Sequence, residues 1–296
     1  MKIVVSGASG LIGSSLVPAL RTAGHDVIRL VRREPSLADE VRWDPAAGEI
    51  DSPRLAGVDA LVNLSGENLA KRWTESRKRE ILNSRVQSTD LLARTASALE
   101  PKPSAFVLAS AVGFYGDRGD EILTEESSGG TGFLADVVRA WEAAADPARA
   151  AGIRVVHLRQ GIVLSQRGGA LKPMLLPFRL GVGGRVGSGE QWWSWVAMDD
   201  LKAAYAFALR SDIAGAVNLT APNPATNEQF TEALGKSLRR PTGLPLPGFA
   251  ARVLFGEMGE TMLLGGQRVL PARLQDAGFT FEAPTIDAGV ARALAE

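Results

Sequence analysis

The stretch that decides the fold is Lys2-Ile-Val-Val-Ser-Gly7-Ala-Ser-Gly10-Leu-Ile-Gly13, at the amino-terminal end of the chain. Its first five residues form a β-branched run that predicts a short buried strand. The apolar residues of 11–23 then recur at helical spacing, and Gly24 fits as the end of that helix. The glycines therefore lie in a strand-to-helix turn, the context that a dinucleotide-binding loop requires.

The three glycines have different expected roles in such a loop. Gly7 permits the tight turn, Gly10 lets the backbone approach a pyrophosphate, and Gly13 lets the helix pack closely on the sheet. The free N–H groups at the helix N-terminus attract the phosphates. A glycine-rich turn without a ligand is the alternative, although strand, helix and spacing all agree. The residues expected to bind the dinucleotide are Gly7, Ser9, Gly10, Leu11, Ile12 and Gly13.

Strands and helices alternate along the first part of the chain. Strands are predicted at 26–32, 59–64, 105–110 and 153–158, and long helices at 74–99 and 134–150. A polar stretch with Pro45, Gly48 and Pro53 indicates a small hairpin or loop. The alternation predicts an α/β fold, a Rossmann-like doubly wound parallel sheet.

The regular pattern fades after about residue 165, which indicates a smaller C-terminal substrate-side domain. We expect residues 1–165 to form the dinucleotide-binding domain, with 199–220 returning to it, and 166–198 and 221–296 to form the smaller lobe. A helix interrupted by Pro173 and Pro177 is predicted at 171–180, and the glycine-rich stretch 181–189 is a candidate lid.

The second strand indicates which dinucleotide binds. A protein that prefers NAD would end this strand with Asp or Glu, to hold the ribose 2′-hydroxyl. Val31 stands there instead, and Arg32 and Arg33 follow. Guanidinium groups suit a 2′-phosphate, so the residues favour NADP, with two exposed loop charges as the alternative.

Composition excludes several classes of function. The formal net charge is zero, which gives no reason to expect nucleic acid or a membrane as partner. There is no cysteine, and the two histidines, His25 and His157, are interpreted as structural, so no metal site is expected. No apolar run is long enough to span a bilayer, and we expect a soluble, cytoplasmic protein.

Further motifs make the chain similar to the YfcH-type epimerase family, an atypical branch of the extended short-chain dehydrogenases/reductases. The matching stretches are Gly7–Gly13, Asn63–Glu67, Ser84-Arg85, Ser110–Gly116, Trp141-Glu142, Arg159–Leu164, Gly187–Trp195, Arg268–Leu274 and Ala277–Phe279. The last two resemble that family's C-terminal domain of unknown function.

The resemblance implies more contacts with NADP(H). Leu64 and Ser65, with Gly66, follow the third strand, and the end of that strand is where a dinucleotide lies in any case. The resemblance adds Glu80 and Arg85 from the long helix, where a solvated charged face is the alternative, and Val163 near the nicotinamide. It also leaves open a homodimer through the helices at 74–99 and 134–150.

The usual catalytic pair of the wider superfamily, Tyr-x3-Lys, is absent. Phe133 or Leu134 stands where the tyrosine would be, and Val137 or Val138 where the lysine would be. Ser110 remains at the end of its strand, where the superfamily places a hydroxyl that contacts cofactor and polarises substrate. Ser110 and Tyr115 are therefore the predicted catalytic residues, with Tyr115 as a replacement acid or, alternatively, a packed side chain.

The sequence gives fewer indications of the substrate-binding residues than of the cofactor-binding ones. Trp192, Trp193 and Trp195 either stack on a substrate or pack between the lobes, and Arg179 and Arg185 are candidates to touch an anion. The leading hypothesis is an NADP(H)-dependent oxidoreductase on an unidentified small-molecule carbonyl or alcohol. A non-catalytic NADP(H) sensor or regulatory protein is the alternative, and a sugar-nucleotide epimerase, by fold analogy alone, is a weaker one.

Overall fold

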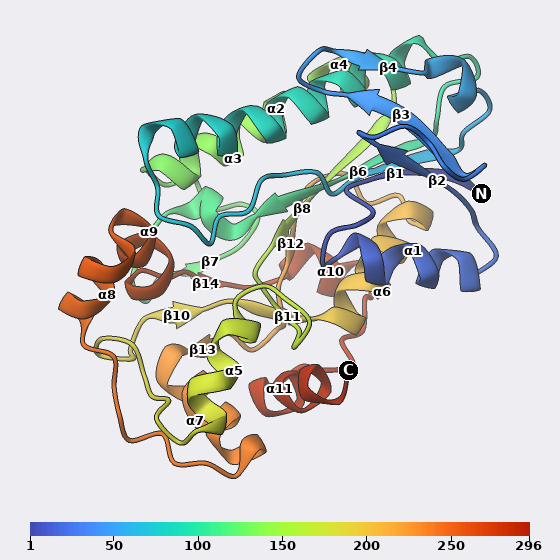
Figure 1. The fold of residues 1–296 in the computed structure, drawn as a ribbon. Coiled ribbons are helices and arrows are strands. Elements are labelled where there is room, and N and C mark those ends of the chain that lie inside the picture. The colour runs from blue at the N-terminus through green and yellow to red at the C-terminus, as the bar shows by residue number, and fades with distance from the viewer.

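An eight-stranded sheet runs through the centre of the structure, a computed structural model that describes residues 1–296 (Figure 1). All neighbouring strands are parallel except the last pair, β3 and β4, which form a hairpin. In spatial order the strands are β12 (Gly215–Leu219), β8 (Arg154–Gln160), β6 (Ala105–Ala111), β5 (Ala60–Asn63), β1 (Lys2–Ser6), β2 (Asp26–Val31), β3 (Glu40–Asp44) and β4 (Glu49–Ile50).

Helices cover both faces of this sheet, which confirms the predicted doubly wound fold. One face carries α1 (Gly13–Thr22) and α6 (Met198–Arg210), and the other carries α2 (Glu75–Ala98), α3 (Phe133–Ala143) and α4 (Asp146–Ala150) (Figure 1). Apolar side chains of alternate strand residues fill both layers. Ile3 and Val5 of β1 face α1, whereas Val4 packs toward the α2 layer.

The strand order reverses direction at β1, which has β2 on one side and β5 on the other. In open α/β sheets a ligand binds in the crevice at such a reversal, beyond the carboxyl ends of the strands. The end of β1, the end of β5 and the N-terminus of α1 therefore meet where the sequence predicts a dinucleotide.

Three predicted elements differ from the structure. The stretch between the second and third strands holds the hairpin β3–β4, but β3 also joins the parallel sheet, which its polar sequence did not indicate. The predicted helix 134–150 breaks between α3 and α4, because Pro147 has no N–H to continue the helix. Conversely, α5 (Leu171–Arg179) is unbroken, and Pro173 lies in its first turn, where no N–H is needed.

A smaller lobe lies beneath the carboxyl ends of the strands (Figure 1). Its core packs α5, α7 (Asn227–Leu238) and α11 (Ile286–Ala295) around short strand pairs. These pairs are β9 (Ile162–Leu164) with β11 (Trp195–Ala197), and β10 (Trp192–Trp193) with β13 (Ala225–Thr226). The remaining elements are η1 (Ser52–Leu55), η2 (Val112–Tyr115), β7 (Ile122–Leu123), α8 (Gly248–Phe255), α9 (Glu257–Gly259), the π-helix η3 (Glu260–Leu264), β14 (Arg268–Val269) and α10 (Ala272–Asp276).

The C-terminal segment is attached to the edge of the large sheet. Arg273 donates hydrogen bonds to the carbonyls of Ala214 and Ala216, at the start of the edge strand β12. Asn218 of β12 donates to the carbonyl of Leu270, and Leu274 is fully buried in the same core cluster as α1 and α6. Residues from the two ends of the chain thus share one hydrophobic core.

Candidate functional site

The glycine loop after β1 has little room for side chains on its protein side. A Cβ on Gly7, whose φ is +67°, would lie 2.7 Å from the carbonyl carbon of Leu64. One on Gly13 would lie 2.3 Å from the carbonyl oxygen of Gly7. At Gly10 the nearest protein atom would be 3.3 Å away. Gly7 and Gly13 are therefore required by the fold, whereas a Cβ on Gly10 would meet a single protein atom, the carbonyl oxygen of Gly7, in a tight contact.

The N-terminus of α1 is free to bind an anion. No side chain caps it, and its first turn contains no acidic residue. The amides of Leu11 and Ile12 donate to no acceptor within the protein. Free N–H groups and the positive end of the helix dipole fit a pyrophosphate, so the residues present suit a dinucleotide.

The two arginines after β2 differ in their surroundings. Arg33 donates two hydrogen bonds to the carboxylate of Glu40, at 2.9 and 2.6 Å, and Glu40 is fully buried at the start of β3. The guanidinium of Arg32 is exposed and has no partner in the protein. Only Arg32 is free to contact a phosphate without breaking an existing ion pair.

The residues after β5 lie against a half-buried cation. Ser65 donates its N–H to the side chain of Asn63, and Gly66 lies over the guanidinium of Arg85, where a Cβ would be 3.1 Å from Cζ. Arg85 donates to the carbonyls of Glu67 and Ile81 and forms no ion pair. Burial lowers the pKa of Arg85 to about 10, so it stays charged at neutral pH. A half-buried guanidinium that forms no ion pair favours an anionic ligand.

Glu80 and Val163, two other residues predicted to contact the cofactor, lie in different surroundings. Glu80 is exposed on α2 and forms an ion pair with Arg77. Val163 of β9 is half-buried and packs against the core cluster that contains β1 and α1, as does Leu11. The structure brings Val163 and Leu11 to one region, and leaves Glu80 paired within its own helix.

Ser110 belongs to a charged network that the sequence did not reveal. Its hydroxyl donates to Oε1 of Glu142, on α3, at 2.6 Å. Arg159, on β8, forms a bidentate ion pair with the same carboxylate at 2.9 and 2.8 Å. Burial alone would raise the pKa of Glu142, but the hydrogen bonds and charge of Arg159 outweigh it and lower that pKa. Glu142 is therefore ionised at neutral pH and accepts a hydrogen bond from the Ser110 hydroxyl.

Tyr115 is fully buried, which bears on its predicted role as an acid. Its hydroxyl donates to Oδ1 of Asn218 at 2.7 Å and accepts from Arg159 at 3.1 Å. Burial raises the pKa of this phenol. Both hydrogen-bonding positions of Tyr115 are occupied by protein groups, so in this conformation the structure places it as a packed, internally bonded side chain.

The helix that would carry the usual catalytic pair is apolar at those positions. Phe133 packs edge-to-face on Trp73, with ring centroids 5.2 Å apart. Val137 and Val138 are buried. The first titratable group facing Ser110 from this helix is Glu142, one turn beyond them. The sequence did not identify Glu142 and Arg159 as site residues, because their pairing depends on the three-dimensional fold. One signal was available: Arg159 is the single charged residue in the segment 155–164, which spans most of the predicted strand and the residues after it.

The three tryptophans do not form one stacking surface. Trp195 is buried and donates to the carbonyl of Asn223, and Trp193 packs against Phe230. Trp192 is half-exposed, with its ring 4.3 Å from the guanidinium of Arg268. Two of the three therefore belong to the core of the small lobe.

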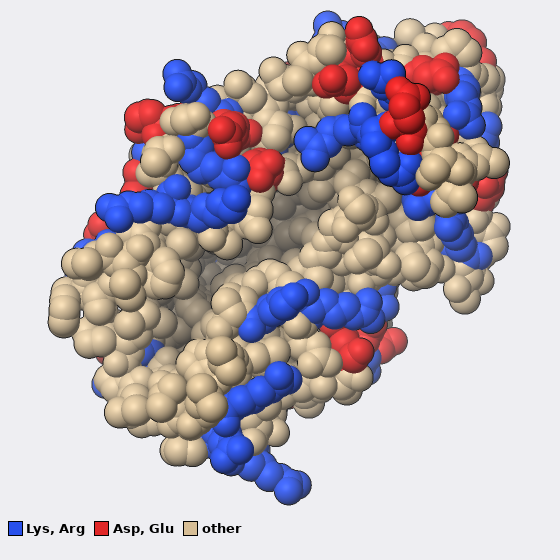
Figure 2. Space-filling model, in the orientation of Figure 1, with Lys and Arg blue, Asp and Glu red and all other residues tan.

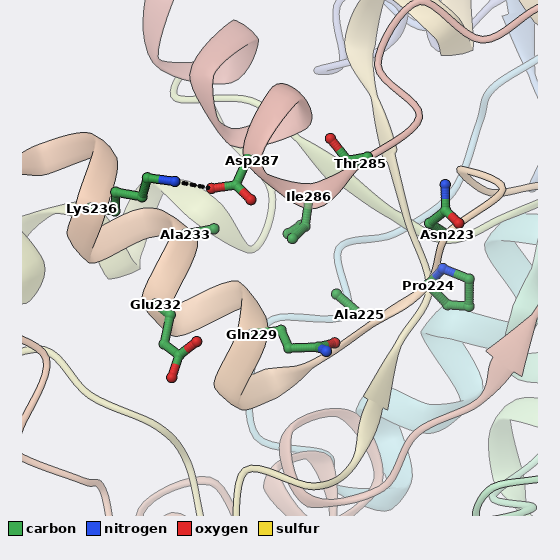
Figure 3. Close-up of a pocket in the computed structure, with 10 residues that line it drawn as sticks. All are labelled: Asn223, Pro224, Ala225, Gln229, Glu232, Ala233, Lys236, Thr285, Ile286 and Asp287. Carbon is green, nitrogen blue, oxygen red and sulfur yellow. Dashed lines mark hydrogen bonds and ion pairs between the residues drawn. The ribbon is translucent and has the colours of Figure 1, made fainter.

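Figure 2 shows a deep hollow between the sheet layer and the small lobe. A separate pocket of about 490 Å³ lies between α7 and α11 (Figure 3). Three of its polar side chains are already engaged: Lys236 pairs with Asp287, and Gln229 caps the first turn of α7. The hollow beside the strand ends is therefore the candidate active site. No helix has the length and apolarity to cross a bilayer, and no cluster of three potential metal ligands occurs.

The fold and the site define a dinucleotide-binding protein of the extended short-chain dehydrogenase/reductase type. Residues 3–219 match the NAD dependent epimerase/dehydratase family, to which the chain belongs. Residues 246–293 match a domain of unknown function, DUF1731. Both matches confirm the resemblance drawn from the sequence motifs.

Similar proteins occur in bacteria and in animals. The chain is 45% identical to the epimerase family protein Mb2239 of Mycobacterium bovis over 286 residues, which cover 96% of this chain and 94% of that protein. The crystal structure of human epimerase family protein SDR39U1 with NADPH is similar with a TM-score of 0.90 and 35% identity, with 100% of both chains covered. A nucleoside-diphosphate sugar epimerase from Corynebacterium glutamicum has a TM-score of 0.82 and 40% identity, over 99% of this chain and 58% of that one.

Proposed function

We propose that this chain is an NADP(H)-dependent oxidoreductase that acts on a carbonyl or alcohol group of a small molecule. The proposal is carried by two observations, a free helix N-terminus after β1 and an unpaired arginine, Arg32, directly after β2. The NADPH in the human relative supports the same cofactor here. When bound, NADP(H) supplies or accepts a hydride.

Each part of the cofactor has a matching group in this chain. The loop from Gly7 to Gly13 holds the pyrophosphate, and Arg32 contacts the 2′-phosphate. Leu64 and Ser65 border the adenosine side, while Val163 borders the nicotinamide side. Arg85 adds a positive charge beneath Gly66 that stabilises the anionic cofactor.

On the substrate side, the acting group is Ser110 with its partners. Glu142 accepts a hydrogen bond from the Ser110 hydroxyl and so fixes its orientation, and Arg159 fixes Glu142. In this arrangement the Ser110 oxygen can accept a hydrogen bond from a substrate alcohol. To polarise a carbonyl oxygen, the hydroxyl must turn from Glu142 to the substrate. Tyr115 supports Arg159 from behind and contributes no proton of its own.

Calorimetric titration of NADPH, NADP, NADH and NAD tests the cofactor. We expect the phosphorylated forms to bind much more tightly, and binding to raise the melting temperature. A broad panel of carbonyl compounds then tests for oxidation of NADPH. Ser110→Ala should lower turnover much more than it weakens NADPH binding. Failure of all four dinucleotides to bind would overturn the proposal at its base.

A non-catalytic NADP(H) sensor is the second candidate. The buried, fully bonded hydroxyl of Tyr115 and the apolar residues at 133 and 137 favour it, because none of them transfers a proton. Pull-downs with and without NADPH distinguish the two functions. A partner captured only with NADPH, together with no turnover of any carbonyl, favours the sensor, whereas turnover excludes it.

A further inference from the structure

Charge is distributed unevenly over the small lobe, although the whole chain has no net charge. Residues 166–189 contain four Lys or Arg and no Asp or Glu, and so do residues 233–256. Both stretches therefore carry positive charge only. They are separated by more than forty residues of ordinary mixed charge.

The fold brings these two stretches together. Gly184 pairs with Gly243, and Val186 pairs with Leu246. The N–H of Leu246 donates to the carbonyl of Arg185 at 2.8 Å, and Gly181 lies against Pro241. We call the combined surface of 166–189 and 233–256 the basic face. It includes α5, the C-terminal end of α7 and α8.

Four cations of the basic face have no acidic partner. Their side chains are exposed and form no ion pair; they are Lys172, Arg179, Arg239 and Arg240. In Figure 2 the lower lobe is mainly tan and blue with little red, whereas blue and red are interspersed over the upper part. The other four cations of the basic face, Arg167, Arg185, Lys236 and Arg252, each pair with a carboxylate, so the face keeps an excess of positive charge.

The basic face is also where large apolar side chains are exposed. Of the ten most exposed ones in the protein, seven lie on it: Leu176, Leu180, Val182, Leu244, Phe249, Val253 and Leu254. Leu176 and Leu180 are one turn apart on α5, and Phe249 and Val253 are one turn apart on α8. Their exposed fractions run from 51% to 71%, so most of each side chain is in water.

We propose that the basic face docks onto an anionic lipid bilayer. Exposed apolar side chains enter the interface, and unpaired Lys and Arg contact the anionic headgroups, as in other peripheral proteins. Charge complementarity favours this occupant over a second copy of the chain. A symmetric dimer through this face would bring two patches with an excess of positive charge together. The interaction is peripheral and adds to the proposed function without depending on it.

Co-sedimentation with vesicles tests the proposal. We expect the full chain to bind vesicles of phosphatidylcholine with phosphatidylglycerol, to bind phosphatidylcholine alone weakly, and to dissociate as salt rises. Arg179→Gln and Arg239→Asn should each weaken binding about five-fold, since a juxtamembrane cation contributes about 1 kcal/mol. Asn suits position 239 because φ there is 54°.

Matched controls separate the face from general charge or hydrophobicity. Leu180→Asp should abolish vesicle binding, whereas Leu37→Asp, at a site 56% exposed in the sheet domain, should not. Arg79→Gln removes an exposed, unpaired cation on α2 and should have no effect. The variants must keep the wild-type melting temperature.

Three outcomes would overturn the proposal. One is no binding to vesicles of either composition. Another is equal loss in the face variants and the controls. The third is a concentration-dependent dimer in sedimentation velocity that Leu180→Asp dissociates, which would assign the face to a second copy.

Discussion

Arg33 neutralises the buried carboxylate of Glu40, and by doing so it ties the loop after β2 to the start of β3. Further hydrogen bonds to Glu40 come from the N–H groups of Ser36 and Leu37. The loop that carries Arg32 is therefore fixed at both ends before any ligand binds. A preformed site loses less entropy on binding.

Arg32→Ala should reduce the preference for NADPH over NADH by about ten- to a hundred-fold, because one charge-assisted contact contributes about 1.5–3 kcal/mol. Stability should be unchanged, since Arg32 has no partner. Calorimetric titration of both cofactors measures this. Arg42→Ala, which removes an exposed cation paired with the exposed Glu34, is the control and should keep the preference.

Glu40 should contribute to the pH dependence of the free energy of unfolding. Hydrogen bonds from Arg33, then from the backbone of Ser36, lower its pKa from 4.5 to about 2. The unfolded chain binds the proton more readily, so the contribution of Glu40 is complete above about pH 4.5 and is lost as pH falls toward 2. Urea unfolding of wild type and Glu40→Gln should differ at neutral pH and converge in acid. A constant difference down to pH 2 would contradict this.

The glycine loop predicts opposite results for two neighbouring substitutions. Gly13→Ala forces a Cβ to within 2.3 Å of a backbone oxygen and should destabilise the fold by about 3 kcal/mol. Gly10→Ala meets only one protein atom, at 3.3 Å, and should fold normally but bind NADPH at least about ten-fold more weakly. Thermal melting and titration separate these effects. Normal NADPH binding by Gly10→Ala would show that the pyrophosphate does not approach the backbone at Gly10.

Tyr115→Phe distinguishes a structural tyrosine from an acid. Loss of the hydroxyl removes one buried hydrogen bond from Asn218 and one from Arg159, so we expect a loss of about 1–3 kcal/mol in the free energy of unfolding. Turnover and NADPH affinity should be retained. Tyr205→Phe is the matched control, since its buried hydroxyl also bonds to a side chain, Gln160. Loss of turnover in Tyr115→Phe alone would restore its role as an acid.

Local patterns predicted the strand, the glycine turn and the helix that the structure shows. The three parts are contiguous in sequence, so their spacing determines the geometry of the turn. The substrate half depends on residues far apart in sequence, since Ser110, Glu142 and Arg159 come from three elements. Likewise, Arg32 and Arg33 differ because Arg33 pairs with Glu40 of β3. The sequence indicated only a small hairpin or loop there, and the pairing depends on how β3 joins the parallel sheet.

The attachment of the C-terminal segment to β12 has a consequence for how the two regions of the chain fold. Arg273 and Leu274 lie within the DUF1731 region, yet they cover a sheet edge and fill a core built from the other family's residues. An uncovered edge strand is a template for aggregation. In this chain, removal of residues 246–293 would uncover the edge strand β12 and take Leu274 out of the core, so we expect the two regions to fold only together.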